Sequence, residues 1–111
     1  MGKYSDLATT VFGFLGKMTK ESPDLTSGFL KMHHTISENK ALSGKQKELM
    51  ALGIAIVLRC EGCIACHTKG AVDAGATKEE ILETIEVAIV MGGGPSVVYS
   101  EKAYQAMTEL I

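Results

Sequence analysis

Residues 43–75 read SGKQKELMALGIAIVLRCEGCIACHTKGAVDAG, and this stretch carries the strongest structural signals of the chain. Ser43, followed three residues later by Gln46, has the spacing of a capping box, in which each side chain bonds the backbone amide of the other residue. The residues from there to about Leu58 predict one helix, because they include no proline and are mostly apolar. A second helix is predicted to begin at the cysteine cluster and to end at Gly75, since glycine commonly follows the last turn of a helix.

The rest of the chain is also predicted to be helical, because no segment sustains the polar–apolar alternation of a strand. Four further helices are expected: from Tyr4 to Lys20, from the Ser22–Pro23 pair to Ser37, from the capping box at Thr77 and Glu80 to the glycine triplet 92–94, and from Pro95 to about Glu109. We therefore predict an all-α fold of about six helices, forming a single domain over residues 1–111.

The composition narrows the class of protein. Hydrophobic residues make up 46% and charged residues 22% of the 111-residue chain, as in ordinary globular proteins, and a net charge of −2 offers no basic surface for nucleic acid. The longest apolar run ends at Leu58 and is far too short to cross a membrane. Asp6 and the threonines after it interrupt the apolar run that a signal peptide would need, so we expect a cytoplasmic protein.

The third predicted helix is apolar on every side after Glu48. A helix with this pattern is normally buried all round, and a chain of this size has difficulty surrounding one. We therefore expect subunits of a homo-oligomer to share the burial of the segment from Glu48 to Leu58. The alternative is a monomer with this helix at its centre.

The three cysteines of the chain stand three residues apart at Cys60, Cys63 and Cys66, with His67 directly after the last. The second pair and the histidine form a CxxCH sequence, which is typical of a c-type haem attachment site. The first pair is typical of a redox-active dithiol. In the cytoplasm a cysteine cluster is more often catalytic or metal-binding than structural, and haem attachment needs export-side machinery, so the dithiol is the preferred interpretation.

Helical geometry groups part of this cluster on one face. If residues 60–75 are helical, Cys63 lies about 60° and His67 about 20° from Cys60 around the axis, whereas Cys66 lies on the flank. A disulfide is feasible between Cys60 and Cys63 or between Cys63 and Cys66, but Cys60 and Cys66 are about 9 Å apart along the axis. Cys63 therefore belongs to both feasible bonds.

The same position favours reactivity. The first turn of a helix stabilises an anion such as a thiolate, and His67, one turn beyond Cys63, could take up or return a proton. Glu48 would reach His67 if its side of the third helix met the small-residue face of the cysteine helix. Alternatively, Glu48 is an exposed residue of a first helical turn, and the sequence alone leaves both options open.

A metal-binding module is the non-enzyme alternative, since Cys60, Cys63, Cys66 and His67 are all ligand types that zinc accepts. However, a single helix cannot arrange four ligands tetrahedrally around one ion, so we predict no metal and no cofactor. The adjacent His33 and His34 point about 100° apart on a helix, which makes them poor joint ligands, and they are predicted to be surface residues.

With Glu48 included, the pattern becomes Glu-x11-Cys-x2-Cys-x3-His. The stretch KELMALGIAIVLRCEGCIACHTKGAVDAGATKEEILETIEVAIVMGGGP resembles the core signature of the alkyl hydroperoxidase D family, part of the carboxymuconolactone decarboxylase superfamily. The likeness extends from about Lys45 to Tyr99. The family's characterised peroxidases often carry a histidine between the two cysteines, where this chain has Gly62.

The resemblance implies an all-helical, oligomeric fold and a peroxiredoxin-type peroxidase or disulfide oxidoreductase. By this likeness Cys63 attacks a small hydroperoxide, Cys60 resolves the sulfenic acid as a disulfide, and Glu48 and His67 relay protons. An external dithiol, either a lipoyl group or a thioredoxin-like protein, would reduce the disulfide, and small members form trimers or hexamers. The decarboxylases of the superfamily, which act on a small organic acid, are the alternative, but they lack the cysteine pair.

Overall fold

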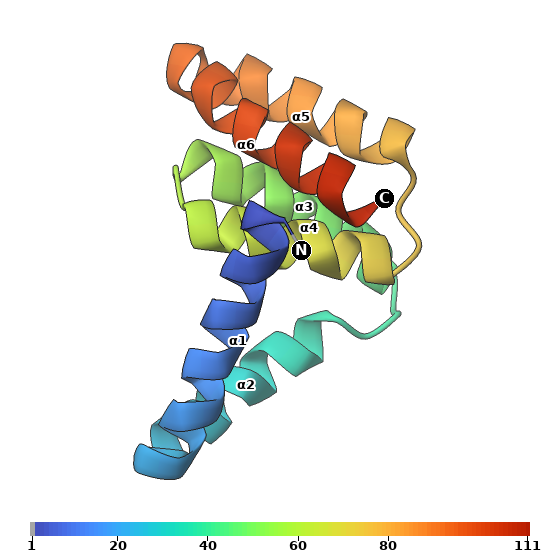
Figure 1. Cartoon of the computed structure of the whole chain (residues 1–111). Coiled ribbons are helices and arrows are strands. Elements are labelled where there is room, and N and C mark those ends of the chain that lie inside the picture. Colours follow the sequence, from blue (N-terminus) through green and yellow to red (C-terminus); the bar gives the residue numbers. More distant parts are fainter. Residues whose placement is uncertain (1) are drawn as a thin grey trace.

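The computed structural model describes residues 2–111, and within them it contains six helices and no strand (Figure 1). The helices are α1 (Lys3–Glu21), α2 (Pro23–Ile36), α3 (Gly44–Val57), α4 (Glu61–Asp73), α5 (Lys78–Gly92) and α6 (Gly94–Leu110). The all-α prediction is confirmed, and both predicted capping boxes form, at the start of α3 and at the start of α5. None of the described helices is long and apolar enough to cross a membrane.

Helices α3 to α6 form the body of the molecule. In Figure 1, α5 and α6 lie side by side above α3 and α4. Each of these helices contributes side chains to one buried apolar cluster. The alanine residues of this cluster allow the helices to pack closely. The buried members of the cluster are Leu52, Ala55, Ile56, Ile64, Ala71, Ala76, Ile81, Ile85, Ala88, Ala103 and Met107. This cluster fixes the relative positions of α3 and α4, which carry the predicted site residues.

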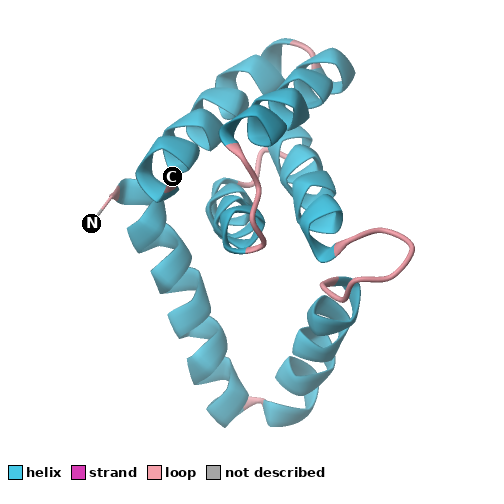
Figure 2. Cartoon of the chain, turned by 90° about the vertical axis from the view of Figure 1, so that its right-hand side faces the viewer, coloured by secondary structure: helices cyan, strands magenta, loops and turns pink. Residues whose placement is uncertain are grey.

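Helices α1 and α2 form a hairpin that projects from the body (Figure 2). The start of α1 is anchored, because Tyr4 is buried and Glu109 on α6 accepts hydrogen bonds from the Tyr4 and Ser5 amides at 2.8 and 3.1 Å. Helix α2 buries only Thr26, whose hydroxyl donates to the Met18 carbonyl of α1 at 3.1 Å. A helix of 14 residues is marginal by itself in water, so α2 depends on contacts beyond its own hydrogen bonds.

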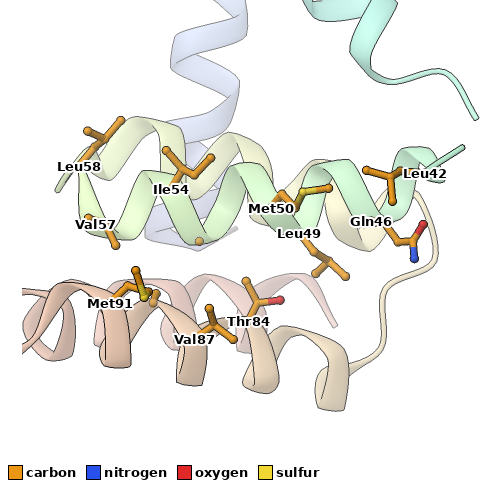
Figure 3. Close-up of a pocket in the computed structure, with 12 residues that line it drawn as sticks. Leu42, Gln46, Leu49, Met50, Ile54, Val57, Leu58, Thr84, Val87 and Met91 are labelled. Carbon is orange, nitrogen blue, oxygen red and sulfur yellow. The ribbon is translucent and has the colours of Figure 1, made fainter. Parts of the chain in front are cut away.

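Helix α3 is covered on one side only. Leu52 and Ile56 are fully buried in the body, whereas Ile54 and Leu58 are 59% and 69% exposed. This exposed side, together with residues of α5, borders an apolar groove of about 690 Å³ (Figure 3). The groove is lined by Leu42, Gln46, Leu49, Met50, Gly53, Ile54, Val57, Leu58, Thr84, Val87, Ala88 and Met91. Its own chain thus leaves one side of this helix uncovered, and whether other subunits cover it stays a prediction.

The connection between α3 and α4 is a tight reversal. The Arg59 amide donates to the Ile56 carbonyl and the Cys60 amide to the Ala55 carbonyl, at 3.0 and 3.1 Å, which is the hydrogen-bond pattern of a Schellman motif. This motif requires a left-handed residue after the helix, and Arg59 supplies it with φ of 57°. An arginine rather than a glycine therefore holds the strained position directly before the first cysteine.

Substitution of Arg59 tests this strain. Arg59→Gly is expected to raise the free energy of unfolding by about 0.5–1 kcal/mol, because glycine adopts the left-handed region without a Cβ clash. Arg59→Val is expected to lower it by about 1–2 kcal/mol, since a β-branched residue is least tolerated there. Urea unfolding at a fixed protein concentration measures both, with Arg59→Lys as the matched control. Equal stability of the glycine and valine variants would contradict the assignment.

Candidate functional site

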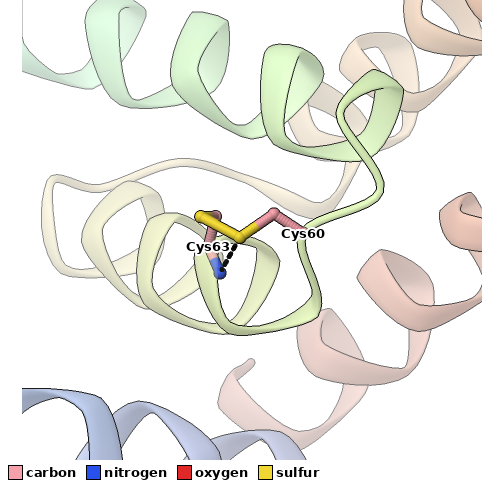
Figure 4. The surroundings of a disulfide bond; sticks show 2 residues. All are labelled: Cys60 and Cys63. Atoms are coloured by element: carbon pink, nitrogen blue, oxygen red, sulfur yellow. Dashed lines mark hydrogen bonds between the residues drawn. A yellow bond between two sulfur atoms is a disulfide. The ribbon is translucent and has the colours of Figure 1, made fainter.

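The first two cysteines form a disulfide at the N-terminus of α4 (Figure 4). Their Cα atoms are 5.2 Å apart, and both residues are partly exposed. The single-face prediction assumed that Cys60 is helical, and this assumption is wrong. Cys60 is the N-cap of α4, with extended backbone angles, because the reversal at Arg59 ends at this residue. Cys60 thus reaches Cys63 from in front of the helix rather than along its face.

The sulfur of Cys60 caps the N-terminus of α4, as a side-chain oxygen does in many helices. Its Sγ atom accepts a hydrogen bond from the Cys63 amide at 3.2 Å (Figure 4). This amide is one of the unpaired donors of the first helical turn, where the partial positive charge of the helix favours an anion. The geometry would therefore stabilise negative charge on Cys60 whenever the disulfide opens.

One turn further along α4, His67 is paired with Glu48 of α3. The distance between His67 Nδ1 and Glu48 Oε2 is 2.9 Å, and the two side chains are only 18% and 19% exposed. The structure thus decides between the two options that the sequence left open for Glu48. With its proton on Nδ1, the imidazole donates to the carboxylate and keeps Nε2 available for proton transfer.

Gly70 makes room for this pair. A Cβ atom added to Gly70 would overlap the carboxylate of Glu48, so the glycine allows α3 to bring its acidic side chain against the surface of α4. The prediction that small residues on this face permit close approach is confirmed here. The carboxylate therefore occupies space that any other residue at this position would take.

The third cysteine lies apart from this arrangement. Cys66 is a free thiol and packs against the cluster formed by Tyr4, Ala8, Ala65 and Ala106 at the root of α1. Burial, with a smaller contribution from Glu48, raises the pKa of the Cys66 thiol above its usual value. Both effects disfavour the thiolate form of Cys66, which lies on the flank of α4 as predicted.

A residue that the sequence did not assign to the site lies against it. His33 of α2 is exposed, as predicted, but its ring stacks on that of His67, with centroids 5.8 Å apart and an interplanar angle of 10°. The two residues are far apart in sequence, and the path of the hairpin brings them together. The adjacent histidine pair in α2 was the only sequence signal that could have drawn attention to it.

No group of three or more His, Cys, Asp or Glu side chains within residues 2–111 is arranged to hold a metal ion. Three of the four residues of the metal-binding alternative are otherwise engaged. Cys60 and Cys63 are bonded to each other, and His67 is bonded to Glu48. What the arrangement provides is a disulfide at a helix N-terminus with an acid–imidazole pair one turn away.

Comparison with known proteins gives a consistent family. A sequence profile of the carboxymuconolactone decarboxylase family matches residues 23–106. A crystal structure of a family protein from Legionella pneumophila is 39% identical, covers 97% of this chain and 96% of that chain, and superposes with a TM-score of 0.92. A family protein from Thermotoga maritima, for which a part in the antioxidative response has been suggested, is 30% identical with a TM-score of 0.83, covering 93% of this chain and 88% of that one.

A more distant relative carries a named activity. The alkyl hydroperoxide reductase AhpD of Corynebacterium kroppenstedtii is 32% identical over 56 residues, which are 50% of this chain and 32% of that protein. The family profile and the two family structures span most of the six helices described above. This chain therefore belongs to the carboxymuconolactone decarboxylase family.

Proposed function

We propose that the protein is a thiol-dependent peroxidase or disulfide oxidoreductase, in which Cys63 attacks, Cys60 resolves, and Glu48 and His67 relay protons. The observation that carries the proposal is the Cys60–Cys63 disulfide at the N-terminus of α4, one turn from a largely buried Glu48–His67 pair. The named activity of the Corynebacterium relative and the role suggested for the Thermotoga protein are of the same kind.

The first step consumes the oxidant. The thiolate of Cys63 attacks the terminal oxygen of a hydroperoxide, an S–O bond forms and the O–O bond breaks. Cys63 is oxidised to a sulfenic acid, and the alkoxide leaves as an alcohol after taking up a proton. In this step Nε2 of His67, whose Nδ1 is held by Glu48, takes up the proton of the Cys63 thiol and returns it to the alkoxide.

The second step closes the disulfide. The thiolate of Cys60, favoured by the Cys63 amide, attacks the sulfur of the sulfenic acid, so that the S–S bond forms and the S–O bond breaks. The leaving hydroxide takes up a proton from solvent and becomes water. An external dithiol then returns two electrons by exchange at Cys63, and Cys60 departs as the leaving thiolate. Because Cys60 lies at the helix N-terminus, its thiolate is stabilised both when it attacks and when it leaves.

The roles of the cysteines can be separated by substitution. Cys63→Ser is expected to abolish hydroperoxide consumption, because the attacking thiolate is lost. Cys60→Ser is expected to consume about one equivalent and to stop as the sulfenic acid, since attack survives and resolution does not. Stopped-flow oxidation with mass-spectrometric mapping of the bonds measures both, and Cys66→Ser is the control. Loss of activity in the Cys66 variant with retention in the Cys63 variant would refute the assignment.

The proton relay can be tested without touching a thiol. Glu48→Gln removes the charge, and Gly70→Ala forces the carboxylate away from its position, so both variants are expected to slow thiol oxidation on the order of 10²-fold. His67→Ala should match them. Gly16→Ala is the matched control, because a Cβ there meets no atom within 4 Å. A Gly70→Ala protein that reacts at the full rate would show that the pair takes no part in catalysis.

We also propose that the protein works as a homo-oligomer, a trimer or hexamer, with the groove between α3 and α5 covered by other subunits. Light scattering at micromolar concentration is expected to show the oligomer, and Ile54→Glu, which places a charge in the groove, is expected to dissociate it. Lys78→Glu, an exposed change outside the groove, serves as the control. A monomeric wild-type protein would contradict the proposal.

A further inference from the structure

We propose that His33, carried by the projecting hairpin, is a positioning residue of the dithiol site that holds the ring of His67 in its working orientation. The inference rests on the proposed function and extends it to a residue outside the body of the molecule. The proposed role gives His33 no direct contact with the reacting sulfur atoms. His33 acts through His67.

The contact between the two rings is specific in its geometry. Their planes differ by only 10° and their centroids are 5.8 Å apart, within the range of offset-stacked rings. His33 is in turn braced on α2 by Phe29, whose ring centroid is 5.0 Å away at an interplanar angle of 51°. Phe29 precedes His33 by one helical turn, so the two rings lie on the same face of α2.

Two restraints are needed to fix the imidazole of His67, and the structure supplies one from each side. Glu48 holds the Nδ1 edge at 2.9 Å, but one hydrogen bond leaves the ring free to tilt about it. The flat contact with His33 restrains that tilt. Together they fix the direction of Nε2, and a proton donor is effective only when its direction and distance suit the reacting atom.

The two partners of His67 come from helices that are buried to different extents. Glu48 comes from α3, inside the body, whereas His33 comes from α2, which buries only Thr26 within its own chain. The acid partner of His67 is therefore built into the core, and its stacking partner depends on how the hairpin is held. The orientation of Nε2 is coupled to the position of α2.

Three variants separate stacking from other effects. His33→Ala removes the ring, and His33→Phe keeps a flat ring but removes its nitrogen atoms. His34→Ala changes the adjacent exposed histidine, which is not stacked on His67. Because His33 is exposed on α2, these changes leave the buried core intact, which circular dichroism checks.

The first readout is the oxidation rate of the reduced protein by hydrogen peroxide. His33→Ala is expected to lower the second-order rate constant on the order of tenfold, a size typical of outer residues that orient a functional imidazole. His33→Phe is expected to restore most of the rate, and His34→Ala to leave it unchanged. A phenylalanine variant as slow as the alanine variant, or an alanine variant as fast as the wild type, would overturn the inference.

The second readout does not depend on peroxide chemistry. Stacked aromatic rings shift each other's proton resonances, so the ring protons of His67 are expected to move in His33→Ala and to change little in His34→Ala. Unchanged His67 resonances in His33→Ala would overturn the inference even if the enzyme is active. If the wild type did not react with hydroperoxides but these resonances moved, the proposed function would fail and the positioning of His67 would stand.

Discussion

The reversal at Arg59 is the constraint on which the site depends. Its left-handed backbone folds α4 back along α3, and it places Cys60 in front of the new helix rather than inside it. Glu48 and Gly70 are equally spaced in sequence from Arg59, so the antiparallel helices bring them level with each other. The carboxylate fills the space left by the missing Cβ and reaches His67, one turn nearer the disulfide.

The features that depend only on neighbouring residues in the chain were predicted correctly from the sequence. The capping boxes at Ser43 and Thr77 form because each is settled within four residues, and the helices begin and end close to the expected positions. The partnership of Glu48 with His67 depends on how two helices rotate against each other, which periodicity does not specify. Cys60 does not lie on the predicted helical face, because a Schellman motif ends α3 directly before it. The usual sequence signal for this motif is a glycine, and here arginine holds that position.

The stack of His33 on His67 lay beyond sequence reasoning for a different reason. Its existence depends on the direction in which the hairpin leaves and returns to the body, and α2 has almost no buried residues whose spacing would reveal that direction. Leu25 and Met32 are exposed apolar residues of α2, and Ile54 is exposed beside the open groove. The chain leaves both of these apolar surfaces uncovered.

Beside the apolar packing of Tyr4 and Ala8 against Ala65 and Cys66, two contacts of the hairpin reach α4 near its first two cysteines. At the root of the hairpin, the buried Tyr4 hydroxyl donates to Glu61 Oε2 at 3.2 Å, and burial together with Glu61 raises the pKa of this phenol to about 12, so the donor stays protonated. On its returning arm, His33 lies on His67. Glu61 and His67 stand on either side of Cys63 in α4, so the two contacts lie on either side of the proposed attacking residue. A displacement of the hairpin would therefore change contacts in the two turns of α4 that carry the proposed site.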